Sequence, residues 1–233
     1  MTKPLCIVIG VGPGNGASFA RRFSSDAHHV AILARNANYL NSLAKTIPQC
    51  HAFPCDVQKP KALRKTLAEV AARLGPASVM IYNAGEGEWR PPEETTLEGF
   101  ESSWRTNALG LLVSAQAMFQ EMSTQGRGNI VVIGATASIR GGATSTAFAS
   151  AKAAQRSLAQ SLARRFSPKG IHVSHIIIDG IIDLPRTREK RPDAPDDFYL
   201  QPDDIAETVA TITQQPRSAW TFEVDLRPHT ENW

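Results

Sequence analysis

The sequence lacks any concentrated positive charge. Its 233 residues carry a net charge of +3, and no run of basic residues is longer than two or three. Clustered lysine and arginine attract nucleic acids and acidic membrane surfaces, so the composition gives no electrostatic reason to expect either partner. No apolar run approaches the ~20 residues that a membrane-spanning helix needs. We therefore predict no nucleic-acid or membrane partner, no signal peptide and a cytoplasmic location.

Cysteine is scarce as well. The three cysteines, Cys6, Cys50 and Cys55, do not have a spacing typical of a metal or redox site, so we predict no metal. An odd count suits a reducing compartment better than a disulfide framework. Cys6 lies within an apolar run, which predicts a small buried hydrophobic side chain.

The sequence does contain a regular alternation of short apolar runs and amphipathic segments. This alternation predicts one α/β domain over residues 1–233, a doubly wound parallel sheet of about seven strands with helices on both faces. The expected strands are 5–9, 29–34, 50–53, 78–82, 129–134, 171–178 and 220–225. The expected helices are 15–25, 38–46, 59–74, a short one from about 96 that leads into a longer one, 146–166 and 203–214.

A glycine-rich stretch follows the first apolar run. Gly10 and Gly14 stand between that run and a helix expected from about Asn15, and Gly16 is in the first turn of that helix, which gives the order strand, tight turn, helix. Glycines let a backbone turn sharply and approach a phosphate closely, and the helix presents free N–H groups and its positive dipole end to the anion. The stretch predicts a dinucleotide site, and a loop that merely turns the chain is the alternative.

An arginine follows the second expected strand. Dinucleotide folds read the adenosine ribose at this point, where an acid would bind a free 2′-hydroxyl. The chain offers Arg35 and no acid there. A guanidinium suits a 2′-phosphate, so we predict NADP in preference to NAD. The alternative is an arginine exposed to solvent with no ligand.

Two further strand ends have residues suited to the same ligand. Asp56 and Val57 follow the third strand, where an acid either meets the adenine amino group or helps to start the next helix, with Asp56 itself or a neighbour as the N-cap. Asn83, Ala84 and Gly85 follow the fourth strand, and small residues there let a ligand lie against the carboxyl edge of a parallel sheet.

One connection is too long to be a simple turn. Residues 180–202 hold many prolines and charges, which predicts a lid or substrate loop, with a disordered surface excursion as the alternative. The loop 86–92, which includes Trp89, is the other candidate wall of a substrate site.

These motifs together resemble those of the classical short-chain dehydrogenase/reductase family over nearly the whole chain. The family's glycine pattern matches at Gly10, Gly14 and Gly16, although Ile9 replaces the usual threonine. The other matching positions are Asp56 and Val57, the Asn83-Ala84-Gly85 triplet, Asn107 as the helix asparagine and Lys152 as the active-site lysine. The resemblance implies an oxidoreductase that transfers a hydride with a nicotinamide cofactor.

Two catalytic positions depart from the family pattern. The family has a tyrosine four residues before the lysine and a serine thirteen residues before that tyrosine. Counting back from Lys152 gives Phe148 and Ala135. A positioned acid or base contributes about 10²–10⁴-fold to rate, and a donor to a developing oxyanion about 10²–10³-fold. Carbonyl reduction by the usual route is therefore expected to be weak.

Other groups near these stretches are candidate replacements. His175 and Asp179 are the better proton carriers, although His175 also suits a core histidine and Asp179 a turn at a strand end. Hydroxyls are poor acids unless activated, and the helical period turns Ser150 away from Phe148. The hydroxyl candidates are Thr136, Ser138, Thr144, Ser145 and Ser150.

The family resemblance gives roles to two remaining residues. Lys152 would bind the nicotinamide ribose hydroxyls, although the tyrosine whose pKa it lowers is missing. A surface lysine on an alanine-rich helix is the alternative. Asn107 would kink its helix and hold a water in a proton relay that lacks its tyrosine.

Two functions remain open from the sequence. One is an NADP-dependent oxidoreductase with altered proton transfer on an unknown carbonyl or alcohol. The other is an inactive NADP-binding protein that acts as a sensor or partner subunit. The resemblance also implies a homodimer or homotetramer that pairs through the helices carrying Asn107 and Lys152.

Overall fold

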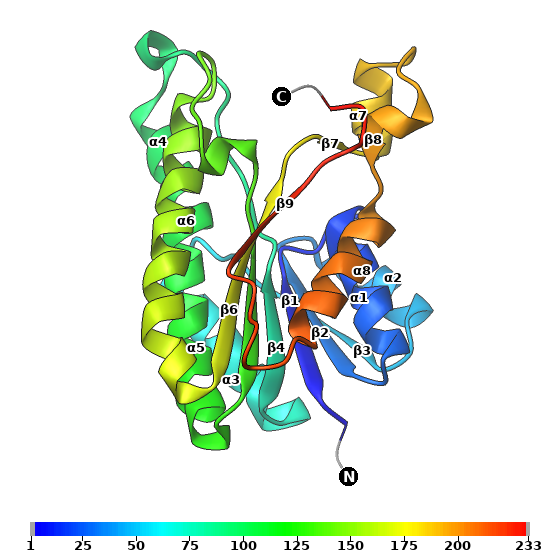
Figure 1. Ribbon diagram of the computed structural model, residues 1–233, viewed down its shortest axis with the longest axis vertical. Helices are drawn as coiled ribbons and strands as arrows, with labels where there is room; N and C mark the ends of the chain where they lie inside the picture. The colour runs from blue at the N-terminus through cyan, green and yellow to red at the C-terminus, as the bar shows by residue number, and fades with distance from the viewer. Residues whose placement is uncertain (1–2, 232–233) are drawn as a thin grey trace.

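The computed structural model describes residues 3–231, so both ends of the predicted domain, residues 1–2 and 232–233, lie outside the described residues. Seven parallel strands form one sheet in the order β3-β2-β1-β4-β5-β6-β9 (Figure 1). The strands are β1 (Leu5–Ile9), β2 (His29–Ala34), β3 (Cys50–Pro54), β4 (Ala77–Tyr82), β5 (Gly128–Ile133), β6 (Ile171–Ile178) and β9 (Glu223–Leu226). The strand order reverses between β1 and β4, and ligands of open α/β sheets bind at the carboxyl ends of strands at such a point.

Helices cover both faces of the sheet, as the alternation predicts. In Figure 1, α3, α5 and α6 lie against one face, and α1, α2 and α8 lie against the other. The helices are α1 (Asn15–Ser25), α2 (Ala37–Thr46), α3 (Pro60–Leu74), α4 (Leu97–Trp104), α5 (Gly110–Gln125), α6 (Thr146–Phe166), α7 (Pro185–Lys190) and α8 (Pro202–Thr213). None of the helices described in residues 3–231 has the length and apolarity to cross a membrane.

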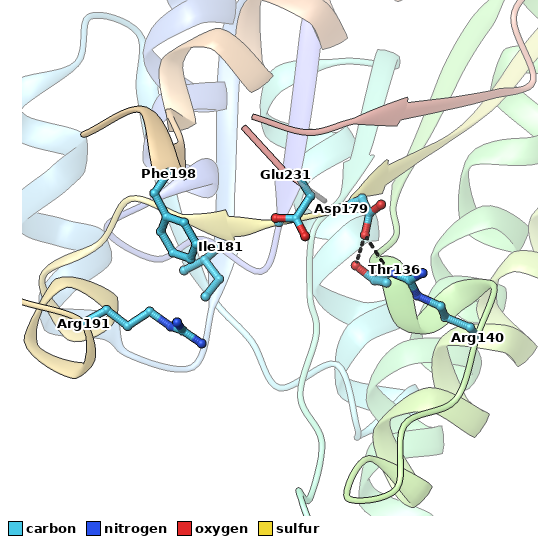
Figure 2. Close-up of a pocket in the computed structure, with 8 residues that line it drawn as sticks. Thr136, Arg140, Asp179, Ile181, Arg191, Phe198 and Glu231 are labelled. Carbon is cyan, nitrogen blue, oxygen red and sulfur yellow. Dashed lines mark hydrogen bonds and ion pairs between the residues drawn. The ribbon is translucent and has the colours of Figure 1, made fainter. Parts of the chain in front are cut away.

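Segment 180–202 is ordered into secondary structure, so the prediction of a disordered excursion is wrong. It holds β7 (Ile181–Ile182), α7, a 3₁₀ turn and β8 (Tyr199–Leu200), and the two strands pair in parallel. The segment rises above the carboxyl edge of the sheet (Figure 1). Figure 2 shows Ile181, Arg191 and Phe198 from this segment on one side of a pocket, opposite Thr136 and Arg140.

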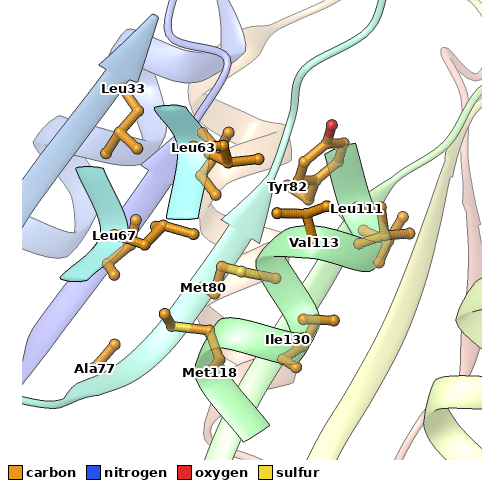
Figure 3. Packing of buried hydrophobic residues seen from close by; sticks show 14 of the residues in the cluster. Leu33, Leu63, Leu67, Ala77, Met80, Tyr82, Leu111, Val113, Met118 and Ile130 are labelled. Atoms are coloured by element: carbon orange, nitrogen blue, oxygen red, sulfur yellow. The ribbon is translucent and has the colours of Figure 1, made fainter. Parts of the chain in front are cut away.

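Two hydrophobic cores hold the sheet between its helix layers. Figure 3 shows part of the first, in which Met80 of β4 and Ile130 of β5 meet Leu67 of α3 and Leu111 and Met118 of α5. All five side chains are at most 3% exposed. Burying a side chain of this size contributes about 1.5–3 kcal/mol, so these layers fix the strand ends that form the site.

One wide turn separates α4 from α5. Residues Arg105–Leu109 form a π-helix, in which the ring closed by each hydrogen bond is one residue larger than in an α-helix. Two carbonyls of this turn accept hydrogen bonds from other elements: Tyr82 Oη donates to Thr106 O at 2.5 Å, and Gln155 Nε2 donates to Asn107 O at 3.1 Å. A Cβ on Gly110 would lie 2.1 Å from Tyr82 Oη, so this glycine makes room for the tyrosine.

Candidate active site

The glycine loop after β1 is packed too tightly for side chains at two of its positions. Gly10 has a φ of +90°, and a Cβ there would lie 2.3 Å from Ala84 N. A Cβ on Gly16 would lie 2.6 Å from Val11 Cα. Asn83 Nδ2 donates to Gly10 O at 2.7 Å, so the Asn83-Ala84-Gly85 segment braces the loop. The structure thus brings the two predicted segments into contact.

The loop is open on the side where a pyrophosphate would lie. A Cβ on Gly12 would meet nothing within 4 Å. Gly14 caps α1, and within residues 3–231 no side chain accepts the first N–H groups of this helix. Asn15 Oδ1 is buried without a partner. Helix N–H groups without a side-chain acceptor, an open face and a buried unpaired oxygen fit a dinucleotide.

Leu184 covers part of this loop. A Cβ on Gly14 would lie 2.5 Å from Leu184 Cδ2. Leu184 follows β7, so segment 180–202 reaches the glycine loop as well as the pocket of Figure 2. The glycine pattern gave no signal of this contact, because its two residues are far apart in the sequence.

Arg35 stands at the carboxyl end of β2 and is already paired. Its Nη1 lies 3.1 Å from a carboxylate oxygen of Glu86, and both side chains are largely exposed, at 64% and 42%. The pair links the end of β2 to the loop after β4. A 2′-phosphate at this point would compete with Glu86 for the same guanidinium.

Asp56 does not cap the helix that follows it. Lys59 is the N-cap of α3, and Asp56 Oδ1 accepts a hydrogen bond from Gln58 N at 3.0 Å. An aspartate commonly bonds the backbone two residues ahead in this way, and the proline at the start of α3 supplies the helix entry. The capping alternative for Asp56 is therefore wrong. Val57 packs against the first core.

Phe148 lies beside a second aromatic ring. Its ring centroid is 4.8 Å from that of Trp89, with the planes tilted by 31°, and Trp89 is 63% exposed. A Cβ on Gly87 would lie 2.6 Å from Phe148, so the 86–92 loop packs closely over the position that the family gives to tyrosine. The two rings form an apolar wall. Ala135 is half-buried and adds no polar group to it.

Lys152 is buried at the centre of the site, so the interpretation as a surface lysine is wrong. It is 4% exposed, and its Nζ donates to Ile133 O at 2.9 Å and to Gln155 Oε1 at 3.1 Å. A Cβ on Gly85 would lie 3.4 Å from this amine. Burial lowers the pKa of Lys152 to about 7.

Asn107 lies on the π-turn and faces the same glycine. Its Nδ2 donates to Glu86 O at 2.7 Å and to Ser103 O at 2.8 Å, while its Oδ1 is buried without a partner. Gln155 was missed by the sequence analysis. Its amide joins the Lys152 amine to the Asn107 carbonyl, and its place three residues after Lys152 on α6 was the available signal.

A second polar cluster stands at the end of β6. Thr136 Oγ1 donates to Asp179 Oδ1 at 2.5 Å, and Asp179 is 6% exposed. Arg227 lies 3.3 Å and Arg140 3.8 Å from this carboxylate. The cluster borders the pocket of Figure 2, which has a volume of about 340 Å³.

Most of the remaining candidate hydroxyls serve local structure. Ser138 Oγ accepts from Ala135 N, Ser145 Oγ accepts from Gly142 N, and Ser150 Oγ donates to Thr146 O. Ser150 is exposed, as the helical period predicts, and Thr144 is exposed as well.

His175 is a core histidine. It is fully buried, its Nδ1 lies 3.0 Å from Glu223 Oε2, and Arg156 holds the same carboxylate with two hydrogen bonds. Burial lowers the pKa of His175 to about 4, against the opposing effect of Glu223. A Cβ on Gly134 would lie 2.4 Å from His175 Nε2, so the backbone of Gly134 covers this nitrogen.

These elements combine an open glycine loop with a buried lysine at the carboxyl edge of a doubly wound sheet. The sequence model described as short chain dehydrogenase matches residues 5–195. The chain belongs to the short-chain dehydrogenase family. A solved short-chain dehydrogenase from Rhodopseudomonas palustris is 34% identical, with a TM-score of 0.84 over 97% of this chain and 99% of that one.

Two further proteins are similar to this chain over nearly its whole length. An uncharacterised oxidoreductase of Staphylococcus aureus (strain MRSA252) is 25% identical over 230 residues, which are 98% of each chain. A solved alcohol dehydrogenase from Thermococcus sibiricus, complexed with 5-hydroxy-NADP, is 24% identical. Its TM-score is 0.88 over 99% of this chain and 98% of that one, and the likeness supports the Rossmann-type fold.

Proposed function

We propose that this chain is an NADP-dependent oxidoreductase of the short-chain dehydrogenase family, acting on a carbonyl or alcohol substrate with non-standard proton transfer. The observation that carries the proposal is the buried Lys152 amine, which faces Gly85 at the strand edge where the glycine loop lies open. A bound nicotinamide would supply or accept the hydride.

Different residues would bind different parts of the cofactor. The N–H groups at the start of α1 would bind the pyrophosphate and Arg35 the 2′-phosphate, in exchange for Glu86. Lys152 would lie beside the ribose hydroxyls, next to the reacting atoms. Structures of the same fold with bound NADP or NADPH, such as the actinorhodin polyketide ketoreductase, support this choice of cofactor.

The substrate side favours an apolar carbonyl. Trp89 and Phe148 form an apolar wall beside Lys152, and the Lys152 Nζ lies 5.8 Å from the centre of the Phe148 ring. A flat aromatic ketone would stack on such a wall. The probe we choose is therefore phenanthrenequinone, with methylglyoxal as a small polar comparison.

Fluorescence titration with NADPH and NADH, followed by NADPH oxidation with these two carbonyls, tests the proposal. We expect NADPH binding and quinone-dependent oxidation above the background of the protein-free mixture. NADPH binding without any turnover would instead favour the inactive sensor or partner subunit, an alternative motivated by Phe148 and Ala135. The double variant Phe148→Tyr, Ala135→Ser then separates the two, because restored turnover would show that only those groups are missing.

A further inference from the structure

The Lys152 amine is fixed by neutral partners. Two of its three hydrogens go to Ile133 O and Gln155 Oε1, and within residues 3–231 no carboxylate lies within ion-pair distance of Nζ. An ammonium loses most of its hydration on burial, and uncharged acceptors restore only part of that stabilisation. The amine is therefore a proton donor that gives up its proton readily.

The fixing partner is itself held by the π-turn. Gln155 donates through Nε2 to Asn107 O, so one amide spans from the widened helix to the lysine. Gln155 is fully buried, which leaves its side chain no freedom to rotate away. An amine held at both acceptors presents its third hydrogen in a constant direction, toward the side of Gly85.

The other candidate proton donors near the site, Asp179 and His175, are held by other partners. Asp179 lies beside Arg227 and Arg140 and accepts the Thr136 hydroxyl, so its carboxylate is already held by these three partners. His175 is covered by the backbone of Gly134 on one side and bound to Glu223 on the other.

The titratable and charged groups around the Lys152 amine are neutral or paired with other residues, so Lys152 is the group among them that we expect to titrate near neutral pH. His175 on β6 stays neutral because burial lowers its pKa to about 4, and the Arg156 guanidinium on α6 is paired with Glu223 on β9. Glu86, whose backbone carbonyl contacts Asn107, turns its carboxylate to Arg35. Phe148 contributes only its ring.

Resting on the proposed function, we infer that the Lys152 ammonium itself gives the proton to the substrate's carbonyl oxygen, while Gln155 is the residue that positions it. In the reducing direction the carbonyl carbon receives the hydride from NADPH. One N–H bond of the ammonium breaks as the alcohol O–H bond forms. This leaves a neutral amine, which regains a proton from solvent.

The first test reads Lys152 directly. Lysine labelled with ¹³C at Cε gives an NMR signal that is assigned by its loss in Lys152→Met. We expect its midpoint to lie near pH 7 in the wild type. In Gln155→Glu a carboxylate replaces the neutral acceptor, so the midpoint should rise by at least about one pH unit. Gln160→Glu places the same charge five residues further along α6 and should leave the midpoint unchanged.

The second test is the pH profile of NADPH oxidation with phenanthrenequinone. We expect kcat to fall as the pH rises through the Lys152 midpoint, and the fall to move upward by the same interval in Gln155→Glu. Lys152→Arg keeps the positive charge for cofactor binding but does not release a proton near neutral pH. It should bind NADPH and lose roughly 10²-fold or more in kcat at pH 7.

The outcomes separate this inference from the proposed function. A Lys152 midpoint near its ordinary value, a kcat profile that ignores the shift in Gln155→Glu, or full turnover in Lys152→Arg overturns only the assignment of the proton donor. A wild type that binds NADPH but oxidises none with either carbonyl overturns both, and one that does not bind NADPH removes the proposed function at its first step.

Discussion

The two halves of the candidate site differ in how closely their residues match the short-chain dehydrogenase pattern. In the half formed by β1, α1 and β4, the backbone leaves no room for a side chain at Gly10 and Gly16, and Asn83 donates a hydrogen bond to Gly10 O. In the half formed by β5 and α6, Phe148 and Ala135 replace the expected polar groups, while Lys152 remains buried among neutral acceptors. Steric constraints between backbones leave few alternatives. A proton donor, in contrast, is replaceable by another group that reaches the same atom.

The largest expected effect is on protein stability, and it tests whether Lys152 is a buried amine that loses its proton readily. Folding lowers the pKa of Lys152 from 10.5 to about 7 because the amine is buried. Between these values the unfolded chain binds a proton that the folded chain does not, so wild-type stability should rise with pH across this window. The total rise is roughly 4 kcal/mol.

Urea unfolding of wild type and Lys152→Met at pH 7 and pH 10 measures this slope. The variant lacks the ionisable group, so its stability relative to wild type should be greatest at pH 7 and decline toward pH 10. Lys65→Met, on the exposed face of α3, is the matched control and should show no such trend. Parallel pH profiles for wild type and Lys152→Met would contradict the buried, readily deprotonated amine.

The next effect concerns the glycine half. Gly10→Ala places a Cβ 2.3 Å from Ala84 N at a φ of +90°, so we expect a loss of about 2–4 kcal/mol in unfolding free energy, with weakened NADPH binding. Thermal and urea unfolding measure it. Gly12→Ala in the same loop meets nothing within 4 Å and should stay within about 0.5 kcal/mol of wild type. Equal losses in the two variants would show that the loop is merely a flexible turn.

The third prediction concerns Arg35, which we expect to bind the 2′-phosphate of NADPH. Hydrogen bonds to charged groups contribute about 1.5–3 kcal/mol, so Arg35→Ala should weaken NADPH binding by roughly tenfold to hundredfold. NADH lacks the 2′-phosphate and cannot form that hydrogen bond. Its affinity should therefore change by less than about threefold in Arg35→Ala. Fluorescence titration with both nucleotides gives the ratio. Equal losses, or none, would exclude the phosphate role of Arg35.

The smallest effect involves the partner of Arg35. Glu86→Gln removes a competing carboxylate from an exposed ion pair, and such pairs contribute about 0.2–1 kcal/mol. NADPH binding should therefore tighten by a few-fold at low salt, and the gain should shrink as salt screens the charges. Glu93→Gln, an exposed acid in the following loop, is the control. Weaker NADPH binding in Glu86→Gln would indicate that Glu86 supports the nucleotide.

Local sequence signals predicted most of the fold. The bounds of α6 and β6 agree with the expectation, because long runs of constant periodicity define them. The last strand begins at Glu223 and not at Trp220, since the pairing with β6 starts only at His175. Segment 180–202 was harder to predict, because its two-residue strands pair with each other and carry no periodicity of their own.

The sequence predicted which segments meet at the candidate site, but not their side-chain contacts. The structure places the glycine loop, the Asn83-Ala84-Gly85 segment and Lys152 at one edge of the sheet, and their role in cofactor binding stays a prediction. Gln155, the Arg35–Glu86 pair and the contact of Leu184 with Gly14 depend on side chains from separate elements, which no local spacing encodes. The assembly into dimers or tetramers through α5 and α6 stays a prediction.

The π-turn between α4 and α5 allows one continuous helical segment to pack against two different helices. An α-helix advances ~100° per residue, so one additional residue in the turn rotates everything after it by about that angle. On either side of this turn, α4 packs against α6 and α5 packs against α3. Removing one residue from Arg105–Leu109 would put these two faces out of phase, and either the contact with α6 or the contact with α3 would be lost.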